Sequence, residues 1–553
     1  MADNNTAFVV VRGMTCQDCA DHVTHALSGL GLTNVDVSWQ DGRASFDWNP
    51  NVSDQELQSA VKNAGYQAGA ISQVTQQNIG PQGISSSDAK DYDFLIIGSG
   101  SAAFSAAIKA RELNYRVAMI EKSTIGGTCV NVGCIPSKAL LEPAALAWHA
   151  GHQPFAGLDI TVGTTALDKL IAQKDSLVLE LRQHKYVDLI DVYGFTLIPG
   201  SAEFVNQNTV RVEGQEISAQ KILIATGSSA WIPPIPGLKD AGYLTSTEAL
   251  DVTEIPKSVA VIGGNSIGLE LGQYFLHIGS KVTFVDIAER IAPFEEPEVS
   301  LEIGKILESE GASILTNATV EKITTTDFGH ELYVSQNDFK TVIQAEKIIV
   351  ATGRRANTES LNLVAAGIET DERGNIVVDA HLQTTNPNIY SAGDVTGGPQ
   401  FVYVAAYEGA LAANNALLGN SRTLDFGGLP KVTFTSPQIA SAGMTEAQAI
   451  SAGFQVVTST LSLEAVPRAL VNHDTAGLVK LVAESGTGRL LGASMVSQGA
   501  GDVIQSAVIA IRHRITAEEM AAMFHPYLTM AESLKLAAQT FTRDVTKLSC
   551  CAS

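Results

Sequence analysis

The chain has 553 residues, too many for one hydrophobic core, and its length predicts three or four domains. Hydrophobic residues make up 45% of it, which is typical of a globular protein, and the net charge of −22 argues against nucleic acid as a partner, because phosphate binding needs a basic surface. Solubility and adaptation to high salt both explain the acidity, and the sequence leaves the two open.

No uninterrupted apolar run reaches about 18 residues, so no membrane span is expected. The N-terminus lacks the basic region and cleavage site of a signal peptide, which predicts a cytoplasmic protein. Paired cysteines in that compartment are more often catalytic or metal-binding than structural. The six cysteines form three close pairs, Cys16/Cys19, Cys129/Cys134 and Cys550/Cys551.

Residues 1–71 predict a small domain with the βαββαβ order of a ferredoxin-like fold, in which Ser53 caps the second helix. The expected elements are a strand at Phe8–Arg12, a helix at Asp18–Leu30, strands at Val35–Trp39 and Ala44–Trp48, a helix at Asp54–Ala64 and a strand at Tyr66–Ile71. Residues 72–90 are rich in Gln, Ser and Gly and predict a flexible linker.

The first cysteine pair lies where a loop enters the first of these helices. Two thiolates in this position can hold a soft metal ion in two-coordinate geometry, and a redox-active CxxC is the alternative. Met14-Thr15-Cys16-Gln17-Asp18-Cys19 resembles the GMTCxxC loop of heavy-metal-associated domains. Together with the βαββαβ order, this resemblance implies a metal carrier.

An internal repeat follows the linker. Each copy reads apolar strand, glycine turn, helix, apolar strand and acidic residue, with 23 positions from Gly98 to Glu121 and 23 from Gly263 to Asp286. Similar closing strands end at Gly227 and Gly353. The repeat predicts two Rossmann-like α/β domains that bind two dinucleotides. Their expected bounds are 91–230 with 356–428 for the first and 231–355 for the second.

The glycines of the first turn, Gly98 and Gly100, allow the backbone to approach a pyrophosphate. The helix after them, which contains Ala103, presents its amides to that anion, and Glu121 is placed to accept hydrogen bonds from ribose hydroxyls.

The second turn runs from Gly263 to Gly268 and has Asn265 where a glycine is usual. Asn tolerates unusual backbone angles, so we expect the turn to survive. Asp286 favours NADH because a carboxylate repels a 2′-phosphate, whereas Arg290 offers the opposite preference.

Residues 429–553 predict an α+β domain with an antiparallel sheet and then three helices. The helices are expected at Gly501–Arg514, Thr516–Met523 and Thr529–Thr542.

The central cysteines have C-x4-C spacing in GGTCVNVGCIPSK, a segment that follows the first nucleotide motif and enters a helix. The helix N-terminus and Lys138 both favour a thiolate at Cys134. A disulfide that only staples a loop is the structural alternative.

This segment resembles the active-site motif of the pyridine nucleotide–disulfide oxidoreductases, and the resemblance covers residues 91–553. It implies FAD in the first repeat, NAD(P)H in the second and a redox-active disulfide. It also implies that Cys134 contacts the flavin, that Cys129 is the more accessible thiol, and that Lys138 pairs with Glu270.

The same resemblance implies the residues that line the two cofactors. For FAD these are Gly98, Gly100, Ala103, Glu121, Ser123, Gly127, Thr128, Lys138, Ala202, Thr226, Gly227, Asp394 and Val402. For the nicotinamide nucleotide they are Gly263, Gly268, Asp286 and Gly353.

The C-terminal sequence separates members of this family. Dihydrolipoamide dehydrogenases carry a histidine with a partner carboxylate, but here His525 is followed by Met530 at the carboxylate position, with Glu532 two residues further on. A histidine without its partner is a poorer general base for thiol–disulfide exchange. Cys550 and Cys551 end the chain as a thiol pair, because adjacent cysteines would form a strained disulfide.

With the N-terminal metal loop, these features resemble the mercuric reductases from end to end. The resemblance implies reduction of Hg(II) to Hg(0) in a homodimer whose C-terminal cysteines pass mercury to Cys129 and Cys134 of the other subunit. Tyr186 and Tyr527 match tyrosines of the mercury path, and ordinary half-buried tyrosines are the alternative. The expected reductant is NADPH, with NADH as the other candidate.

The expected substrate is mercury bound to small thiols, and a mercury transporter or carrier protein is a candidate partner. A dihydrolipoamide dehydrogenase-like disulfide reductase with a fused metal domain is the main alternative. A metal-binding protein with an inactive flavoenzyme part is the second.

Overall fold

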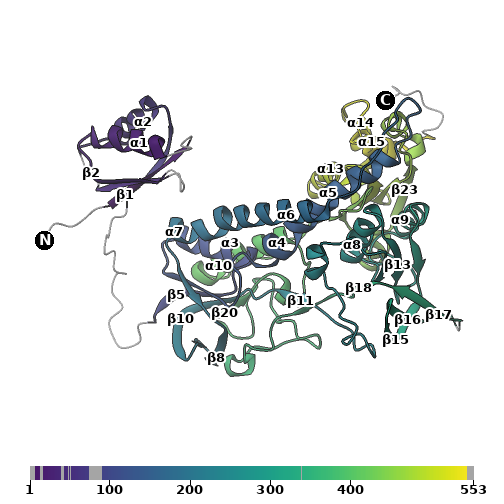
Figure 1. The fold of residues 1–553 in the computed structure, drawn as a ribbon, viewed down its shortest axis with the longest axis horizontal. Coiled ribbons are helices and arrows are strands. Elements are labelled where there is room, and N and C mark those ends of the chain that lie inside the picture. Colours follow the sequence, from purple (N-terminus) through teal and green to yellow (C-terminus); the bar gives the residue numbers. More distant parts are fainter. Residues whose placement is uncertain are drawn as a thin grey trace. The chain divides into compact units, whose positions relative to one another are not determined.

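The computed structural model describes residues 6–12, 17–38, 43–47, 49, 51–73, 90–337 and 339–544 (Figure 1). The chain divides into two compact units, Met1–Ala89 and Lys90–Ser553. Cys16, Cys550 and Cys551 lie outside the described residues. Among the described helices, none combines the length and the apolar character that crossing a membrane requires.

The N-terminal unit has the predicted βαββαβ order. Its elements are β1 (Thr6–Arg12), α1 (Gln17–Ser28), β2 (Thr33–Ser38), β3 (Arg43–Asp47), α2 (Asp54–Asn63) and β4 (Gln67–Gln73). The strands form an antiparallel sheet of order β2-β3-β1-β4, and Ser53 caps α2 by accepting the N–H of Glu56 at 3.3 Å. Because β4 pairs with β1 as far as Gln73, residues 72 and 73 belong to this sheet and not to the predicted linker.

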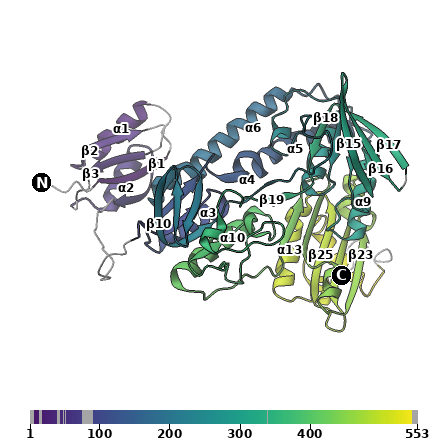
Figure 2. The same ribbon diagram turned by 90° about the horizontal axis from the view of Figure 1, so that it is seen from below.

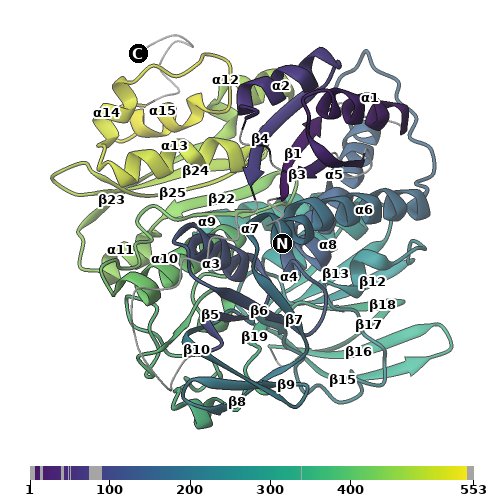
Figure 3. The same cartoon turned by 90° about the vertical axis from the view of Figure 1, so that its left-hand side faces the viewer.

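The first repeat forms a mainly parallel sheet of order β7-β6-β5-β10-β9-β8, with β20 on the other side of β10. Its strands are β5 (Tyr92–Ile97), β6 (Val117–Glu121), β7 (Thr196–Pro199), β8 (Ala202–Asn206), β9 (Thr209–Val212), β10 (Gln215–Ile224) and β20 (Ile389–Ser391). Helices α3 (Ser101–Glu112) and α10 (Val402–Leu418) lie side by side on one face, where their alanines pack on Phe94, Ile96 and Leu223 (Figure 3).

A series of helices connects β6 to β7. It consists of α4 (Gly127–Val132), α5 (Cys134–Gly151), α6 (Leu167–Arg182), the π-turn η1 (Gln183–Val187) and α7 (Asp188–Tyr193).

The second repeat has a four-stranded parallel sheet of order β14-β13-β12-β18. The middle order β13-β12-β18 matches β6-β5-β10 of the first repeat, which confirms the repeat predicted from the sequence. Its elements are β12 (Ser258–Ile262), α8 (Ser266–His277), β13 (Lys281–Val285), α9 (Pro297–Ser309), β14 (Ser313–Leu315), β18 (Lys347–Val350) and the antiparallel ribbon β15 (Ala318–Thr326), β16 (Gly329–Gln336) and β17 (Phe339–Ala345).

A two-stranded connection, β11 (Ser228–Ala230) with β19 (Arg354–Ala356), lies where the chain leaves the first repeat and returns to it. The predicted domain bounds at 230/231 and 355/356 fall on these two strands. Short 3-10 turns complete the region at η2 (Glu248–Asp251), η3 (Leu363–Ala366) and η4 (Asp394–Thr396).

The C-terminal region is a five-stranded antiparallel sheet of order β21-β22-β25-β24-β23, with α13 packed along it (Figure 2). Its elements are β21 (Pro430–Thr433), β22 (Gln438–Gly443), α11 (Glu446–Ser451), β23 (Val456–Ser462), η5 (Leu463–Ala465), α12 (Pro467–Asn472), β24 (Leu478–Glu484), β25 (Leu490–Ser497), α13 (Ala500–Arg512), α14 (Ala517–Ala522) and α15 (Glu532–Gln539). The three predicted helices are present. The edge strand β23 was not predicted, because its outer side chains are exposed and its sequence has no apolar run.

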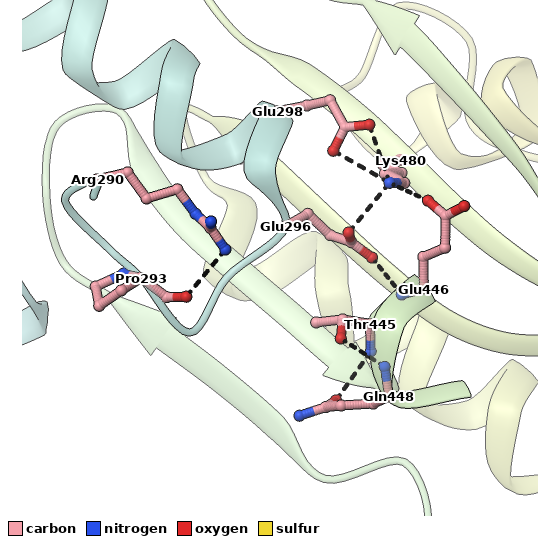
Figure 4. Close-up of polar contacts among 8 residues, drawn as sticks. All are labelled: Arg290, Pro293, Glu296, Glu298, Thr445, Glu446, Gln448 and Lys480. Carbon is pink, nitrogen blue, oxygen red and sulfur yellow. Dashed lines mark hydrogen bonds and ion pairs between the residues drawn. The ribbon is translucent and has the colours of Figure 1, made fainter. Parts of the chain in front are cut away.

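A buried ionic cluster joins the second repeat to this C-terminal region (Figure 4). Lys480 of β24 lies 3.1 Å from Glu296 and 3.0 Å from Glu298, both at the start of α9, and 2.8 Å from Glu446 of α11. Glu296 also accepts the backbone N–H of Glu446 at 2.7 Å. The side chains of Glu296 and Lys480 are each 2% exposed, so this pair is shielded from water, whereas Glu298 and Glu446 are 43% and 39% exposed.

Candidate functional site

The cysteine pair lies at the joint between two helices. Cys129 is inside α4, and Cys134 is the first residue of the 18-residue helix α5. Gly133 allows the joint: a Cβ at this position would lie 2.9 Å from the carbonyl oxygen of Thr128 and 3.3 Å from the Cα of Cys129. The backbone therefore brings the two thiols together only with glycine at position 133.

The surroundings of the pair favour one thiolate. A hydrogen bond from Cys129 and the charge of Lys138 lower the pKa of Cys134 to about 7, against burial and the carboxylate of Glu270, which raise it. The same hydrogen bond, together with burial, raises the pKa of Cys129. The N-terminus of α5 adds a partial positive charge next to Cys134. At neutral pH a substantial fraction of the pair therefore carries one negative charge, on the sulfur of Cys134.

The accessibility of the two thiols differs from the expectation. In the chain by itself Cys134 is exposed at the surface, although the surrounding protein still desolvates its thiol, and Cys129 is half-buried; we expected Cys129 to be the more accessible. The order of accessibility when FAD lies beside Cys134 stays a prediction.

Lys138 links three parts of the fold. It lies one turn after Cys134, and its Nζ is 2.7 Å from Glu270 of α8, a side chain that is 9% exposed. The other carboxylate oxygen of Glu270 accepts the backbone N–H of Phe434 at 2.9 Å, and Lys138 lies 4.5 Å from the centre of the Phe434 ring. The pair expected from the resemblance is thus in contact, and it ties α5, the second repeat and the C-terminal region together.

Tyr186 lies in the π-turn η1 and reaches back toward the cysteines. Its ring meets Phe104 edge-on at 4.9 Å and lies 3.3 Å from where a Cβ of Gly126 would be. Burial raises its pKa, a hydrogen bond with Ser101 opposes this, and the negative charges of Cys129 and Cys134 raise it further. Tyr186 therefore stays protonated at neutral pH and lies within electrostatic range of both sulfurs.

The first glycine turn fits a dinucleotide. Gly98 has φ +111°, and a Cβ there would collide with the carbonyl oxygen of Ala225. A Cβ on Gly127 would lie 2.6 Å from the Cα of Gly100, so the two backbones form a narrow cradle in front of the α3 amides. Such a cradle accepts a pyrophosphate. At the end of β6, the carboxylate of Glu121 accepts hydrogen bonds from the Ser99 hydroxyl at 2.6 Å and the Ser123 N–H at 2.6 Å.

The remaining residues expected at FAD lie on strands and helices of the first repeat. Gly127 and Thr128 begin α4, Ala202 begins β8, Thr226 and Gly227 follow β10, Asp394 begins η4, Val402 begins α10, and Ala103 is buried in α3. Asp394 accepts a hydrogen bond from Ser228 at 2.8 Å, and Thr226 donates to the carbonyl oxygen of Asn357 at 2.9 Å. These residues fit an extended dinucleotide along the carboxyl ends of the strands.

The second turn repeats the first. Gly263 has φ +109°, and a Cβ there would collide with the carbonyl oxygen of Ala351; a Cβ on Gly268 would collide with that of Gly263. Asn265 has φ −105° and ψ −173°, close to Gly100 with φ −79° and ψ −171°. This is extended backbone that any residue adopts, so the expected tolerance of Asn for unusual angles was the wrong reason for its presence.

Asp286, which follows β13, is hydrogen-bonded to the second turn. Its carboxylate accepts the N–H of Gly264 at 2.5 Å and that of Ala288 at 2.8 Å. Arg290 is engaged elsewhere, with Glu289 at 2.5 Å and the carbonyl oxygen of Pro293 at 3.1 Å (Figure 4). Gly353, with φ +119°, ends the segment after β18.

His525 and Tyr527 lie in the loop between α14 and α15. The Nδ1 of His525 is 3.3 Å from the carbonyl oxygen of Met523, and Tyr527 is 53% exposed. Glu532 is buried, and its carboxylate accepts the N–H of Leu528 at 3.3 Å. Of the metal-loop cysteines, Cys19 is half-buried in α1.

Arg354 is a site residue that the sequence reasoning missed. Its Nε donates to the Ser228 hydroxyl at 2.8 Å and lies 3.8 Å from Asp394. Burial lowers its pKa, while Asp394 and Cys134 raise it, so its positive charge acts on both Asp394 and the thiolate of Cys134. The signal was available: the second closing strand continues Ala-Thr-Gly-Arg where the first continues Ala-Thr-Gly-Ser.

Comparison with known proteins places this geometry in a family. The family model described as "Pyridine nucleotide-disulphide oxidoreductase" matches residues 92–409, and the one for the dimerisation domain of the same proteins matches residues 429–538. The chain belongs to the pyridine nucleotide–disulphide oxidoreductases. A heavy-metal-associated domain matches residues 9–67, as the N-terminal loop predicted.

Relatives in this family share most of the chain. A mercuric reductase from Staphylococcus aureus is 47% identical over 99% of both chains, and one from Bacillus cereus is 48% identical over 98% of this chain and 86% of that protein. The structure of the Cu(II) complex of the HOCl-induced flavoprotein disulfide reductase RclA from Escherichia coli matches with a TM-score of 0.73 and 32% identity, over 82% of this chain and 100% of that chain. The recognition and the fold class expected from the sequence are confirmed.

Proposed function

We propose that this pyridine nucleotide–disulphide oxidoreductase reduces Hg(II) to Hg(0). The overall change is balanced by NAD(P)H and Hg(II) giving NAD(P)⁺, a proton and Hg(0). The observation that carries the proposal is the pair Cys129/Cys134, with a lowered pKa at Cys134, in a chain that is 47% identical to a mercuric reductase over almost its whole length. The metal-binding domain match at the N-terminus supports a metal substrate.

The chain's own residues prepare the metal site. Bound FAD supplies two-electron transfer between the nicotinamide nucleotide and the metal. Cys134 provides a thiolate at neutral pH and Cys129 the second thiol, so together they can bind Hg(II) as a dithiolate. Lys138 stabilises the charge on Cys134, and Tyr186, whose ring contacts Phe104 of α3, lies within electrostatic range of the pair.

We propose that mercury reaches this pair by exchange between thiols. Cys16 and Cys19 carry the ion on the N-terminal domain. Cys550 and Cys551 of one subunit deliver it to the central pair of the other. In this path the ion moves between dithiols without being released into solution, and Tyr527 lines the entry. The dimerisation-domain match supports the homodimer that such a path needs.

His525 is proposed to have no strong general-base role. The position that holds a partner carboxylate in dihydrolipoamide dehydrogenases is Met530 here, and Glu532 accepts the backbone N–H of Leu528. Metal transfer between thiols needs no such base.

The family uses FAD and a pyridine nucleotide, and the choice between NADPH and NADH belongs to the proposal. The resemblance stated from the sequence implies NADPH. The local contacts favour NADH, because Asp286 faces the turn and Arg290 bonds to Glu289 and Pro293. We propose that NADPH is the main reductant and that NADH also supports turnover. Comparing the turnover rates with the two nucleotides at equal concentration tests this.

We infer a cytoplasmic location, because the relay works only with reduced thiols. The delivered substrate is mercury bound to small thiols or handed over by a mercury transporter or carrier protein.

One assay tests the proposal against its main alternative. Purified protein is mixed with NADPH, an excess of a small thiol and HgCl₂. Mercury-dependent oxidation of NADPH with release of volatile mercury supports it. Oxidation that occurs only with lipoamide instead supports a dihydrolipoamide dehydrogenase-like disulfide reductase with a fused metal domain. Cys134→Ala is the matched control: it should lose mercury-dependent turnover and keep bound flavin.

A further inference from the structure

Glu408 is a buried carboxylate that the mechanism above does not use. It lies on α10 and is 2% exposed, and its Oε2 accepts the backbone N–H of Gly393 at 2.7 Å. Gly393 directly precedes Asp394, the residue expected at the flavin. A buried carboxylate is rare unless its hydrogen bonds define a geometry, so this contact needs an explanation.

The packing around Glu408 shows what it holds. A Cβ on its neighbour Gly409 would collide with the carbonyl oxygen of Ala102, so α10 touches the backbone of α3 at the start of that helix. A Cβ on Gly393 would lie 3.4 Å from the Cβ atoms of Ala102 and Ala405. The turn at Gly393, the glycine cradle and α10 therefore meet at one place, and Glu408 supplies the polar contact there.

The charged groups near Glu408 lie on the side of the Gly393–Asp394 turn. Asp394 lies in the turn that Glu408 contacts, and Arg354 of β19 lies 3.8 Å behind Asp394. On the α3 side, the backbone of Ala102 lies against Gly409, and Ala102 and Ala103 are buried. Burial raises the pKa of Glu408 to about 7, the N–H of Gly393 lowers it, and the charge of Asp394 raises it further.

We propose that Glu408 is a positioning residue of the flavin site, which holds the Gly393–Asp394 turn against α3 so that Asp394 meets the flavin. The inference rests on FAD binding in the first repeat and goes beyond the proposed function, because neither the repeat nor the cysteine motif assigns a role to this side chain. FAD carries an anionic pyrophosphate, so it binds more tightly when the buried carboxylate of Glu408 is protonated.

The test measures FAD affinity without mercury. Apoprotein is prepared from the full-length chain, and the Kd for FAD is measured by flavin fluorescence between about pH 6 and pH 8. Glu408→Ala leaves the Gly393 N–H buried without a partner, so we expect FAD to bind about tenfold more weakly or worse. Glu408→Gln keeps an acceptor oxygen, so its Kd stays near that of the wild type at about pH 6. Glu112→Ala, an exposed carboxylate on α3, is the matched control and leaves the Kd unchanged.

The pH profile separates positioning from simple packing. The wild type should lose affinity as pH rises through about 7, and Glu408→Gln should not. Equal Kd values for Glu408→Ala and the wild type, or the same pH profile for Glu408→Gln and the wild type, would overturn the inference. A wild-type apoprotein that does not bind FAD at all would instead contradict the proposed function.

Discussion

Two of the lysine–carboxylate contacts that connect the second repeat to the rest of the fold differ in charge balance. Lys138 meets one carboxylate, Glu270, and its side chain is 32% exposed. Lys480 meets three carboxylates and is 2% exposed. Three carboxylates surround the single ammonium of Lys480. Lys138 has one carboxylate partner, and its charge still lowers the pKa of Cys134. The same pair of residue types therefore holds domains together in one place and tunes a thiol in the other.

The largest expected effect is on stability, at the Lys480 junction. Lys480→Met leaves Glu296 buried beside two further carboxylates with no cation, which costs about 3 kcal/mol or more. We expect the melting temperature to fall by roughly 3 °C. Lys305→Met is the matched control, because Lys305 pairs at 3.4 Å with Glu302 on the surface of α9, the helix that begins beside Glu296. That pair contributes at most about 0.5 kcal/mol. Equal melting temperatures for both variants would mean that the Lys480 cluster is not a stabilising junction.

The next effect is on the thiolate. Lys138→Met removes a charge that lowers the pKa of Cys134, so this pKa should rise above about 7, by roughly one unit. The measurement is the rate of alkylation of the reduced protein by iodoacetamide against pH, with Cys134 located by mass spectrometry. In the wild type the rate should rise through about pH 7. An unchanged midpoint in Lys138→Met would contradict the role given to Lys138, and Lys305→Met is again the control.

The partner of Lys138 should act in the opposite direction. The carboxylate of Glu270 raises the pKa of Cys134, so Glu270→Gln should lower it, by less than Lys138→Met raises it. The same alkylation profile then shifts to lower pH. If both substitutions shift it the same way, the effect comes from a distorted backbone and not from charge.

The smallest effect sharpens the contrast in charge balance. Glu298 is 43% exposed and is one of three carboxylates on Lys480, so Glu298→Gln leaves the lysine paired with Glu296 and Glu446. We expect the free energy of unfolding to change by at most about 0.5 kcal/mol. A loss as large as that of Lys480→Met would show that all three carboxylates are needed.

The sequence predicts what is local and repeated. The two glycine turns could be located because strand, glycine and acidic residue recur at one spacing, and each turn has a glycine with φ near +110°. Ser53 was identified as a cap because capping depends on neighbours three residues away. The order of the N-terminal elements followed from their periodicity.

Contacts between distant segments could not be predicted in this way. Lys480 meets Glu296 across 184 positions, and a buried lysine in a strand gives no sign of its partners. Glu408 and Gly393 are close in sequence, but only the fold shows that a carboxylate on α10 accepts that N–H. The Lys138–Glu270 contact, across 132 positions, was expected only through family resemblance.

The π-turn that carries Tyr186 has a consequence for how this segment tolerates change. A π-turn contains one residue more than a regular helical turn. Deleting Gln183, His184 or Lys185 would let α6 run on into α7 as a regular helix and turn Tyr186 about 100° around the helix axis, away from Phe104. The length of this segment is therefore specified as strictly as the identity of its tyrosine, and relatives that keep the aromatic contact should show no single-residue gaps here.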